Sequence, residues 1–172
     1  INHLVLAAVG RALLRMPEVN VVWADDAFVQ LTGSDVGMAV DTERGLFAPV
    51  IRDAGILPLD ALAGAANVIA GRARAGELLA GDLAGGAIAV SNVGMYGASH
   101  LVPIINPGQS AILGVAGIKP VFRPDANEQP VLRREIGLVL SCDHRVLNGV
   151  AAARFLDCIT SILQNPLSLL RI

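Results

Sequence analysis

A run of residues 85–118 that contains no Asp, Glu, Lys or Arg restricts the possible folds of this chain more than any other feature. A run of this length could in principle cross a lipid bilayer. Polar residues, glycines and prolines interrupt it repeatedly, however, and Asn92, His100, Pro103 and Asn106 are among them. Lipid cannot satisfy the backbone groups that such interruptions expose. The run therefore predicts a buried strand, a long turn region and a second buried strand, and no membrane partner.

The composition favours one folded domain in a reducing compartment. Of the 172 residues, 53% are hydrophobic, 16% are charged and 3% are aromatic, which suits a chain with much buried surface. The formal net charge of −2 supplies no overall basic field for a nucleic-acid partner. Lys119 is the only lysine, so a polybasic membrane-surface segment is not expected. Cys142 and Cys158 follow no metal-ligand spacing and are expected to be reduced core residues.

Helical periodicity appears in several segments of the sequence. Residues 1–16 predict a helix that ends before Pro17, and residues 57–74 predict a second helix. A short helix is expected around residues 77–79. A last helix is expected to end at Asn165-Pro166. Its apolar face consists of Ala152, Phe155, Leu156, Ile159, Ile162 and Leu163.

Apolar runs flanked by turn residues predict strands between these helices. The predicted strands cover residues 21–23, 27–31, 35–41, 47–52, 87–92, 110–117, 119–123 and 131–141. The segment PDANEQP, residues 124–130, is typical of an exposed hairpin loop. We therefore expect an α/β fold, a mixed β-sheet covered by helices in a two-layer sandwich. Because residue 1 is not methionine and lies in a helical pattern, the chain is interpreted as a fragment.

His144 lies where a predicted apolar strand meets the last helix, within SCDHRVLNG at residues 141–149. Strand ends of this kind often carry chemistry, yet a lone histidine beside an aspartate is more often structural than catalytic, and Asn148 could simply cap the helix. Signature motifs of serine hydrolases, P-loop proteins and zincins are absent from the sequence. A metal site shared by His100 and His144 is not expected, because Asp143 and His144 would point to opposite sides of a continuing strand.

Several segments resemble, in order along the chain, motifs of the dihydrolipoamide acyltransferases, the E2 components of 2-oxo acid dehydrogenase complexes. SCDHRVLNG is similar to their DHRxxDG signature. Residues 89–117 resemble their Ser-Asn-Leu-Gly and Ile-Asn-Pro-Pro-Gln segments, residues 44–54 their Gly-Leu-x-x-Pro-Val-x-x-Asp-Ala stretch, and residues 155–170 their closing helix. This resemblance implies a chloramphenicol acetyltransferase-like fold. It also implies homotrimers that assemble into a larger core, with each active site at a subunit interface.

The resemblance assigns roles to His144, Ser91 and Asn148. His144 would be the general base, and Ser91 would stabilise the oxyanion. Asn148 stands where the family usually has Asp, so it can cap the helix but cannot balance a buried arginine. Coenzyme A and the dihydrolipoyl group would enter one channel from opposite ends, and the acyl group would pass directly between their thiols. Acetyl is the preferred acyl group because Asn148 resembles some acetyl-transferring members.

The resemblance also implies a multidomain parent. The family's catalytic domain begins several dozen residues earlier, so residues 1–172 would be an N-terminally truncated catalytic domain without the lipoyl and peripheral-subunit-binding domains. Lys119 lies in Gly-Ile-Lys-Pro, unlike the family's lipoyl-bearing Asp-Lys-Ala turn, so a separate lipoyl domain would supply the lipoyl group. E1 and E3 would associate through the missing domains. The bacterial cytoplasm or the mitochondrial matrix is the expected location.

Two alternative functions remain open. The first is a catalytically silent core or binding protein of such a complex, which Asn148 mildly favours and the intact pair of His144 and Ser91 disfavours. The second is an O-acetyltransferase for a free small molecule. The chloramphenicol enzyme's signature begins with His-His, so the Asp143-His144 pair disfavours this alternative.

Overall fold

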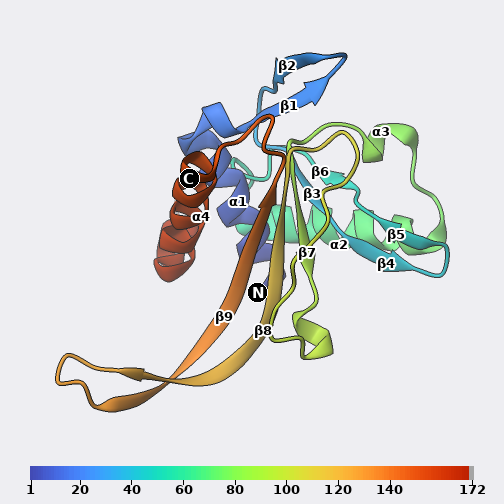
Figure 1. Cartoon of the computed structure of the whole chain (residues 1–172). Coiled ribbons are helices and arrows are strands. Elements are labelled where there is room, and N and C mark those ends of the chain that lie inside the picture. Colours follow the sequence, from blue (N-terminus) through green and yellow to red (C-terminus); the bar gives the residue numbers. More distant parts are fainter. Residues whose placement is uncertain (171–172) are drawn as a thin grey trace.

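A five-stranded mixed sheet lies at the centre of the computed structural model, which describes residues 1–170 (Figure 1). The strands of this sheet are β3 (Val36–Met38), β6 (Val50–Ile51), β7 (Ile88–Asn92), β8 (Ala111–Pro124) and β9 (Pro130–Cys142). Their spatial order is β6, β3, β7, β8, β9. The inner pairs β3–β7 and β7–β8 are parallel, and both edge pairs are antiparallel. The predicted mixed β-sheet is therefore confirmed.

Helices cover one face of this sheet (Figure 1). The longer helices are α1 (Asn2–Arg15), α2 (Leu59–Ala75) and α4 (Gly149–Gln164). Their apolar stripes pack with alternate strand side chains, such as Val90 and Leu113, in a single core, where burial of each large side chain stabilises the fold by about 1.5–3 kcal/mol. Phe155 and Ile159 of α4 are completely buried in this core. The predicted two-layer sandwich is confirmed.

The loop of residues 98–108 covers part of the opposite face of the sheet. A Cβ added at Gly114 of β8 would meet the side chain of Pro103 at 2.9 Å, so the loop lies directly on this strand. The Ser141 hydroxyl donates a hydrogen bond of 2.7 Å to the carbonyl of Pro103. Because protein covers both faces of β7 and the first half of β8, a charge in either strand would have no access to water. This explains the charge-free run and confirms its predicted strand, turn and strand.

Two small antiparallel hairpins stand outside the main sheet. They are formed by β1 (Val21–Ala24) with β2 (Ala27–Gln30), and by β4 (Val40–Thr42) with β5 (Gly45–Phe47). The predicted strand over residues 35–41 is divided, because the chain leaves the central sheet at Ala39. The predicted strand over residues 47–52 is wrong in its extent: Phe47 belongs to a hairpin, and Pro49, which has no N–H for a ladder, separates it from the central sheet.

Other predicted boundaries also needed correction. The short helix expected at residues 77–79 is wrong, since α3 (Ala80–Leu83) begins later and the Asp82 carboxylate accepts the Leu79 N–H at 2.7 Å. The strands expected at residues 110–117 and 119–123 are one strand, β8, with a register shift between Val115 and Ile118.

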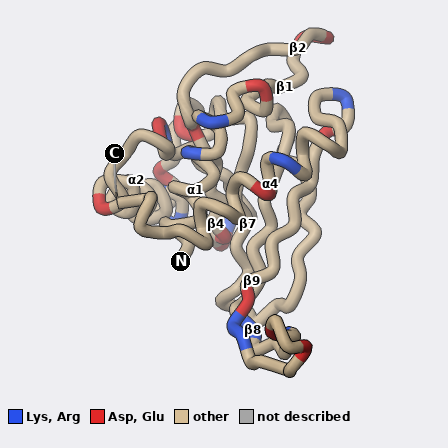
Figure 2. Tube along the Cα trace, turned by 90° about the vertical axis from the view of Figure 1, so that its left-hand side faces the viewer, with Lys and Arg blue, Asp and Glu red and all other residues tan. Residues whose placement is uncertain are grey.

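The loop expected at residues 124–130 is confirmed as the tip of the long β8–β9 hairpin. Asp125 shapes it, because its carboxylate accepts the N–H groups of Asn127 and Gln129. Charged residues of both signs gather at the outer end of this hairpin (Figure 2). Short 3-10 segments complete the fold at η1 (Pro17–Val19), η2 (Gly94–Tyr96) and η3 (Pro166–Leu170). Among residues 1–170, no helix has both the length and the hydropathy to span a membrane.

Candidate active site

A tight turn between β9 and α4 presents His144. Asp143 organises the backbone of this turn: its N–H donates to the carbonyl of Ser110 at 2.8 Å, and its own carbonyl accepts from Val146 and Leu147 at 3.0 and 2.9 Å. Leu147 is buried and anchors the turn in the core. The His144 side chain is exposed, and no side chain among residues 1–170 hydrogen-bonds to its ring. The turn is therefore fixed through its backbone, while the imidazole is open to a reactant.

The Asp143 carboxylate also fixes the side of the turn beyond His144. It accepts the backbone N–H of Arg145 at 3.0 Å and, from the guanidinium, hydrogen bonds from Nε at 3.1 Å and Nη2 at 2.7 Å. The side-chain hydrogen bonds from Arg145 lower the pKa of Asp143 below its usual value, so the carboxylate is ionised at neutral pH. The guanidinium carbon of Arg145 lies 5.4 Å from the centre of the Trp23 ring, which belongs to β1.

Asn148 is the N-cap of α4. Its side-chain oxygen accepts the Ala151 N–H at 2.9 Å, and its carbonyl accepts the Ala152 N–H at 3.0 Å. These bonds satisfy N–H groups that the first turn of a helix leaves unpaired. Within one chain, Asn148 therefore serves the helix that follows His144 and not the imidazole itself.

Ser91 lies near the end of β7, on the border of a cavity of about 340 Å³. Helices α1 and α2, the strands β3, β4 and β5 and the segment after β7 supply the rest of its lining. Its polar lining residues are Asn2, His3, Asp41, Asn67, Arg74, Asn92 and Tyr96. Asn92 donates to the side chain of Asn2 at 3.2 Å, which ties the end of β7 to the start of α1. This cavity combines a hydroxyl, imidazole, cation and carboxylate on one rim, and it is large enough for part of a small ligand.

The structure does not bring Ser91 and His144 together within one chain. Ser91 is adjacent to Gly114 on β8, whereas Cys142, two residues before His144, is adjacent to Ala111. Standard strand rise and spacing place the Ser91 and Cys142 backbones about 14 Å apart. His144 lies two residues beyond Cys142, so its imidazole and the Ser91 hydroxyl of the same chain cannot act on the same atom. One chain therefore presents two half-sites on different parts of its surface.

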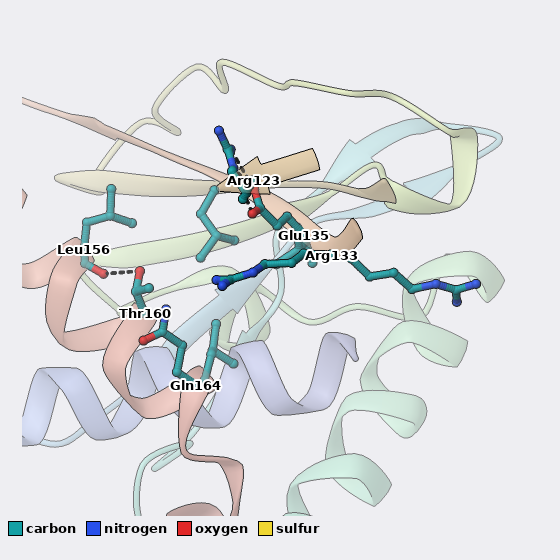
Figure 3. A pocket seen from close by; sticks show the side chains of 10 residues that line it. Arg123, Arg133, Glu135, Leu156, Thr160 and Gln164 are labelled. Carbon is teal, nitrogen blue, oxygen red and sulfur yellow. Dashed lines mark hydrogen bonds and ion pairs between the residues drawn. The ribbon is translucent and has the colours of Figure 1, made fainter. Parts of the chain in front are cut away.

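A second cavity, of about 620 Å³, contains none of these predicted residues (Figure 3). It lies between β9 and α4, where Thr160 donates to the Leu156 carbonyl at 2.8 Å within the helix. On its rim, Arg123 forms an ion pair of 2.7 Å with Glu135, and this hydrogen bonding lowers the pKa of the Glu135 carboxyl. The Glu135 carboxylate is paired with Arg123, and the lining that residues 1–170 supply holds no imidazole or thiol, so we do not place the chemistry here.

Other candidate chemistries receive no support. Among residues 1–170, no three His, Cys, Asp or Glu side chains are grouped as metal ligands would be. Cys142 and Cys158 are both free thiols, and each is only half-buried. Burial raises the pKa of the Cys142 thiol, which therefore stays protonated and weakly nucleophilic at neutral pH.

Sequence reasoning missed the companions of both half-sites. His3 and Arg74 reach the Ser91 cavity from two helices that are distant in sequence, and no spacing pattern links them to Ser91. Trp23 is more than a hundred residues from Arg145 and belongs to a different hairpin. The one available signal was that Trp23 is the only tryptophan of the chain.

Comparison with known proteins identifies the family. The model of the 2-oxoacid dehydrogenases acyltransferase (catalytic domain) family matches residues 1–171, and the chain belongs to this family. The succinyltransferase component of the Escherichia coli K12 2-oxoglutarate dehydrogenase complex is 42% identical over 164 residues, 95% of this chain and 40% of that protein. The acetyltransferase component of the Schizosaccharomyces pombe pyruvate dehydrogenase complex is 36% identical over 176 residues, 99% of this chain and 36% of that protein.

A third relative is named as a component of a complex and not as a transferase. The mouse pyruvate dehydrogenase protein X component is 34% identical over 173 residues, 98% of this chain and 34% of that protein. The chain therefore spans only 34–40% of the length of these three relatives.

Solved structures agree with the family. The Azotobacter vinelandii dihydrolipoamide acetyltransferase superposes with a TM-score of 0.89 at 33% identity, covering 99% of this chain and 70% of that one. The cubic core of the pyruvate dehydrogenase multienzyme complex gives 0.89 at 34% identity, with the same coverage of 99% and 70%. Chloramphenicol acetyltransferase gives 0.54 at 18% identity, covering 94% and 77%. This last likeness confirms the predicted fold only.

Proposed function

We propose that this domain moves an acyl group between the dihydrolipoyl group of a lipoyl domain and coenzyme A, as the core of a 2-oxo acid dehydrogenase complex. The observation that carries the proposal is the exposed His144 on a turn fixed by backbone hydrogen bonds, in a chain with the fold of acyltransferase cores. E1 and E3 components are the other proposed partners. Lys119 lies inside β8, opposite Glu135, and not at a hairpin tip, which supports a lipoyl group supplied by another domain.

In this reaction His144 accepts the proton of the attacking thiol. A thiol pKa near 8.5 and an imidazole pKa near 6.5 make complete proton transfer uphill by about 2.7 kcal/mol, which is small beside a catalysed barrier. The thiolate then attacks the thioester carbonyl, a new carbon–sulfur bond forms, and the other thiol leaves and takes the proton back from His144. The free ring of His144 supports this role, because no internal hydrogen bond must be broken first.

Ser91 is the proposed donor to the oxyanion that forms during this attack. Removal of such a donor typically costs about 2.7–4 kcal/mol of transition-state stabilisation. Because Ser91 and His144 lie on separate half-sites, they can act on one substrate only if two copies of the chain meet, His144 from one copy and Ser91 from its neighbour. We therefore propose a homotrimer, which has one such interface for each subunit. The superposition with the cubic core supports assembly of this kind.

Acetyl is the proposed acyl group, although relatives include both acetyl and succinyl transferases. The work on the Azotobacter vinelandii acetyltransferase concerns the roles of a serine, a histidine and an asparagine in catalysis. That asparagine follows its histidine by four positions, the separation between Asn148 and His144 here. This agreement supports both the proposed site and the choice of acetyl.

Acyl transfer from acetyl-, succinyl- and isobutyryl-CoA to free dihydrolipoamide tests the proposal. We expect the assembled protein to prefer acetyl-CoA and His144→Ala to lower kcat by about 100- to 10,000-fold, the usual contribution of a general base. His100→Ala is the matched control, because His100 is also an exposed loop histidine but lies outside both half-sites. An assembled wild-type protein without transfer to dihydrolipoamide from any of the three thioesters would contradict the proposal.

A catalytically silent core is the second candidate, because one relative is named protein X component rather than transferase. This candidate predicts full assembly, measured by light scattering, together with no His144-dependent turnover. The intact turn around His144 argues against it, since a silent core would not need an exposed imidazole on a fixed backbone.

A further inference from the structure

We propose that the β1–β2 hairpin positions His144, because its Trp23 ring holds the Arg145 guanidinium beside the proposed base. The inference rests on the proposed function, since it concerns the geometry of that base. It makes Trp23 a positioning residue, which acts through Arg145 and does not touch the substrate.

Arg145 is held from two directions at once. The Asp143 carboxylate binds the edge of the guanidinium through Nε and Nη2, and the Trp23 ring lies 5.4 Å from its central carbon. A planar guanidinium can use both surfaces together, the edge for a carboxylate and the face for an aromatic ring. The Arg145 side chain is nevertheless 62% exposed, so these two contacts, and not general burial, set its position.

The hairpin presents Trp23 in a defined orientation. Trp23 is opposite Phe28 in the β1–β2 ladder, and the two rings meet edge to face with centroids 5.1 Å apart. The connecting residues Asp25 and Asp26 have φ values of 49° and 57°, the left-handed pair that closes a tight two-residue hairpin turn. The hydrogen bonds to Asp143 raise the pKa of Arg145, and the charge of Asp26 in the turn adds to this rise.

The base of the hairpin is anchored to the body of the domain. Asn20, which is buried, donates from its side chain to the carbonyls of Leu31 and Gly33 at 3.1 and 3.0 Å. Val22 is buried beneath the sheet of the hairpin. The hairpin therefore connects the His144 turn to a part of the core that lies far from it in sequence. Among residues 1–170, Asp143, from the same turn, is the only residue that hydrogen-bonds to the Arg145 guanidinium.

The consequence concerns the distance between His144 and the attacking thiol. His144 lies between Asp143 and Arg145, whose ion pair joins the two sides of the imidazole, so loss of the Trp23 contact frees one end of this pair. A displacement of about 1 Å at a reacting group can lower the rate about 100-fold. The hairpin therefore affects the chemical step more than the binding of either thiol substrate.

The test compares Trp23→Leu with Trp23→Phe in the assembled protein. We expect Trp23→Leu to lower kcat about 10- to 100-fold with KM and Tm nearly unchanged, and Trp23→Phe, which keeps an aromatic face, to recover most of the loss. Val29→Thr is the control, since Val29 is 40% exposed on the same hairpin and touches neither ring contact. Wild-type kcat in Trp23→Leu, or a loss that follows Tm or occurs equally in Val29→Thr, would overturn the proposal.

A double-mutant cycle asks whether Trp23 acts through Arg145. If it does, Trp23→Leu combined with Arg145→Gln lowers kcat no further than the more severe single variant, because the same contact is removed twice. Additive losses would show instead that Trp23 affects turnover by another route.

Two further readouts do not depend on turnover. Because Trp23 is the only tryptophan, its fluorescence emission should change in Arg145→Gln. Amide exchange of residues 143–147 should accelerate in Trp23→Leu and not in Val29→Thr. Unchanged fluorescence emission and unchanged amide exchange would refute the proposed contact between Trp23 and Arg145. If the wild type has no transferase activity while both changes occur, the contact between Trp23 and Arg145 is supported and the proposed function is contradicted.

Discussion

At the residue scale, Asp143 has several structural roles at once. Its backbone pairs with Ser110 and closes the turn, and its carboxylate binds both the N–H and the guanidinium of Arg145. The sequence placed His144 just past a strand expected to end at residue 141, on the turn before the last helix. In the structure the strand ends at Cys142, so the two side chains belong to a turn with its own hydrogen bonds.

Replacement of Asp143 by Asn should destabilise the protein slightly at neutral pH but not in acid. Side-chain hydrogen bonds from Arg145 lower the pKa of the Asp143 carboxyl below its ordinary value. A lowered carboxyl pKa contributes stability above the unfolded-state pKa and loses it as the pH falls through the folded-state value. The urea midpoints of the wild type and Asp143→Asn should therefore differ at pH 7 and converge as the pH falls through the folded-state pKa of Asp143. Asp157→Asn, at an exposed position of α4, is the control, and a pH-independent difference would contradict the ion-pair account.

Asn148→Ala should lower the free energy of unfolding by about 1 kcal/mol, the usual cost of losing an N-cap. Asn148→Asp should be at least as stable as the wild type, because it keeps the cap and adds negative charge at the helix N-terminus, worth about 0.3–1 kcal/mol. Equilibrium unfolding in urea measures both changes. Equal stability of Asn148→Ala and the wild type would show that the bond to Ala151 contributes nothing.

How much of the site could be predicted differs from residue to residue. His144, Ser91 and Asn148 stand in short segments whose pattern resembles a family, so they were available from the sequence. The residues that surround them could not be predicted from the sequence. Trp23 and His3 approach these residues through folding of distant segments, and nothing in local spacing records such an approach.

At the element scale, a close backbone approach joins α1 to the turn before α2. A Cβ added at Gly10 of α1 would overlap the backbone of Ala54 and Gly55, and one added at Gly55 would overlap Gly10 in return. The Gly55 N–H is also fixed, since it donates to the Ser34 hydroxyl at 3.0 Å. The two segments touch through backbone alone, which sets the distance of α1 from the sheet.

Gly10→Ala should therefore lower the free energy of unfolding by about 1–3 kcal/mol, because the added methyl overpacks this contact. Gly64→Ala is the matched helical control: Gly64 is exposed in α2 and has no atom within 4 Å of an added Cβ. It should raise the free energy of unfolding by about 0.5–1 kcal/mol, since alanine loses less conformational freedom in a helix. Thermal and urea unfolding check both values, and similar changes in the two variants would refute the close packing.

Elements were predicted well where apolar periodicity was long. Helix α4 and strand β7 follow long apolar patterns, as does the second half of β9, and their predicted positions are correct. The segment of residues 35–52 was predicted poorly, since its short strands belong to two sheets and the pattern does not say which partner each strand takes. The division at Ala39 depends on tertiary pairing with β7, which only the folded chain reveals.

At the scale of the whole molecule, the two half-sites give a testable prediction about assembly. Chains carrying His144→Ala or Ser91→Ala should each be nearly inactive in homotrimers. Unfolded together and refolded in equal amounts, they should regain about a quarter of wild-type activity, the fraction of interfaces at which both intact residues meet by chance. Mixing the two assembled homotrimers without subunit exchange should restore no transferase activity. No recovery from confirmed mixed trimers would contradict a site shared between copies.

The separation of Ser91 from His144 also affects the chain before it has assembled. On the proposed mechanism, a newly synthesised copy carries the proton acceptor and the hydroxyl on different surfaces and can complete neither direction of the exchange. Thioesters are energy-rich, and a lone subunit with a finished site could discharge them to water. Because the site is divided between neighbouring subunits, activity appears only in the assembled particle. On this mechanism, unassembled subunits do not hydrolyse acyl-CoA.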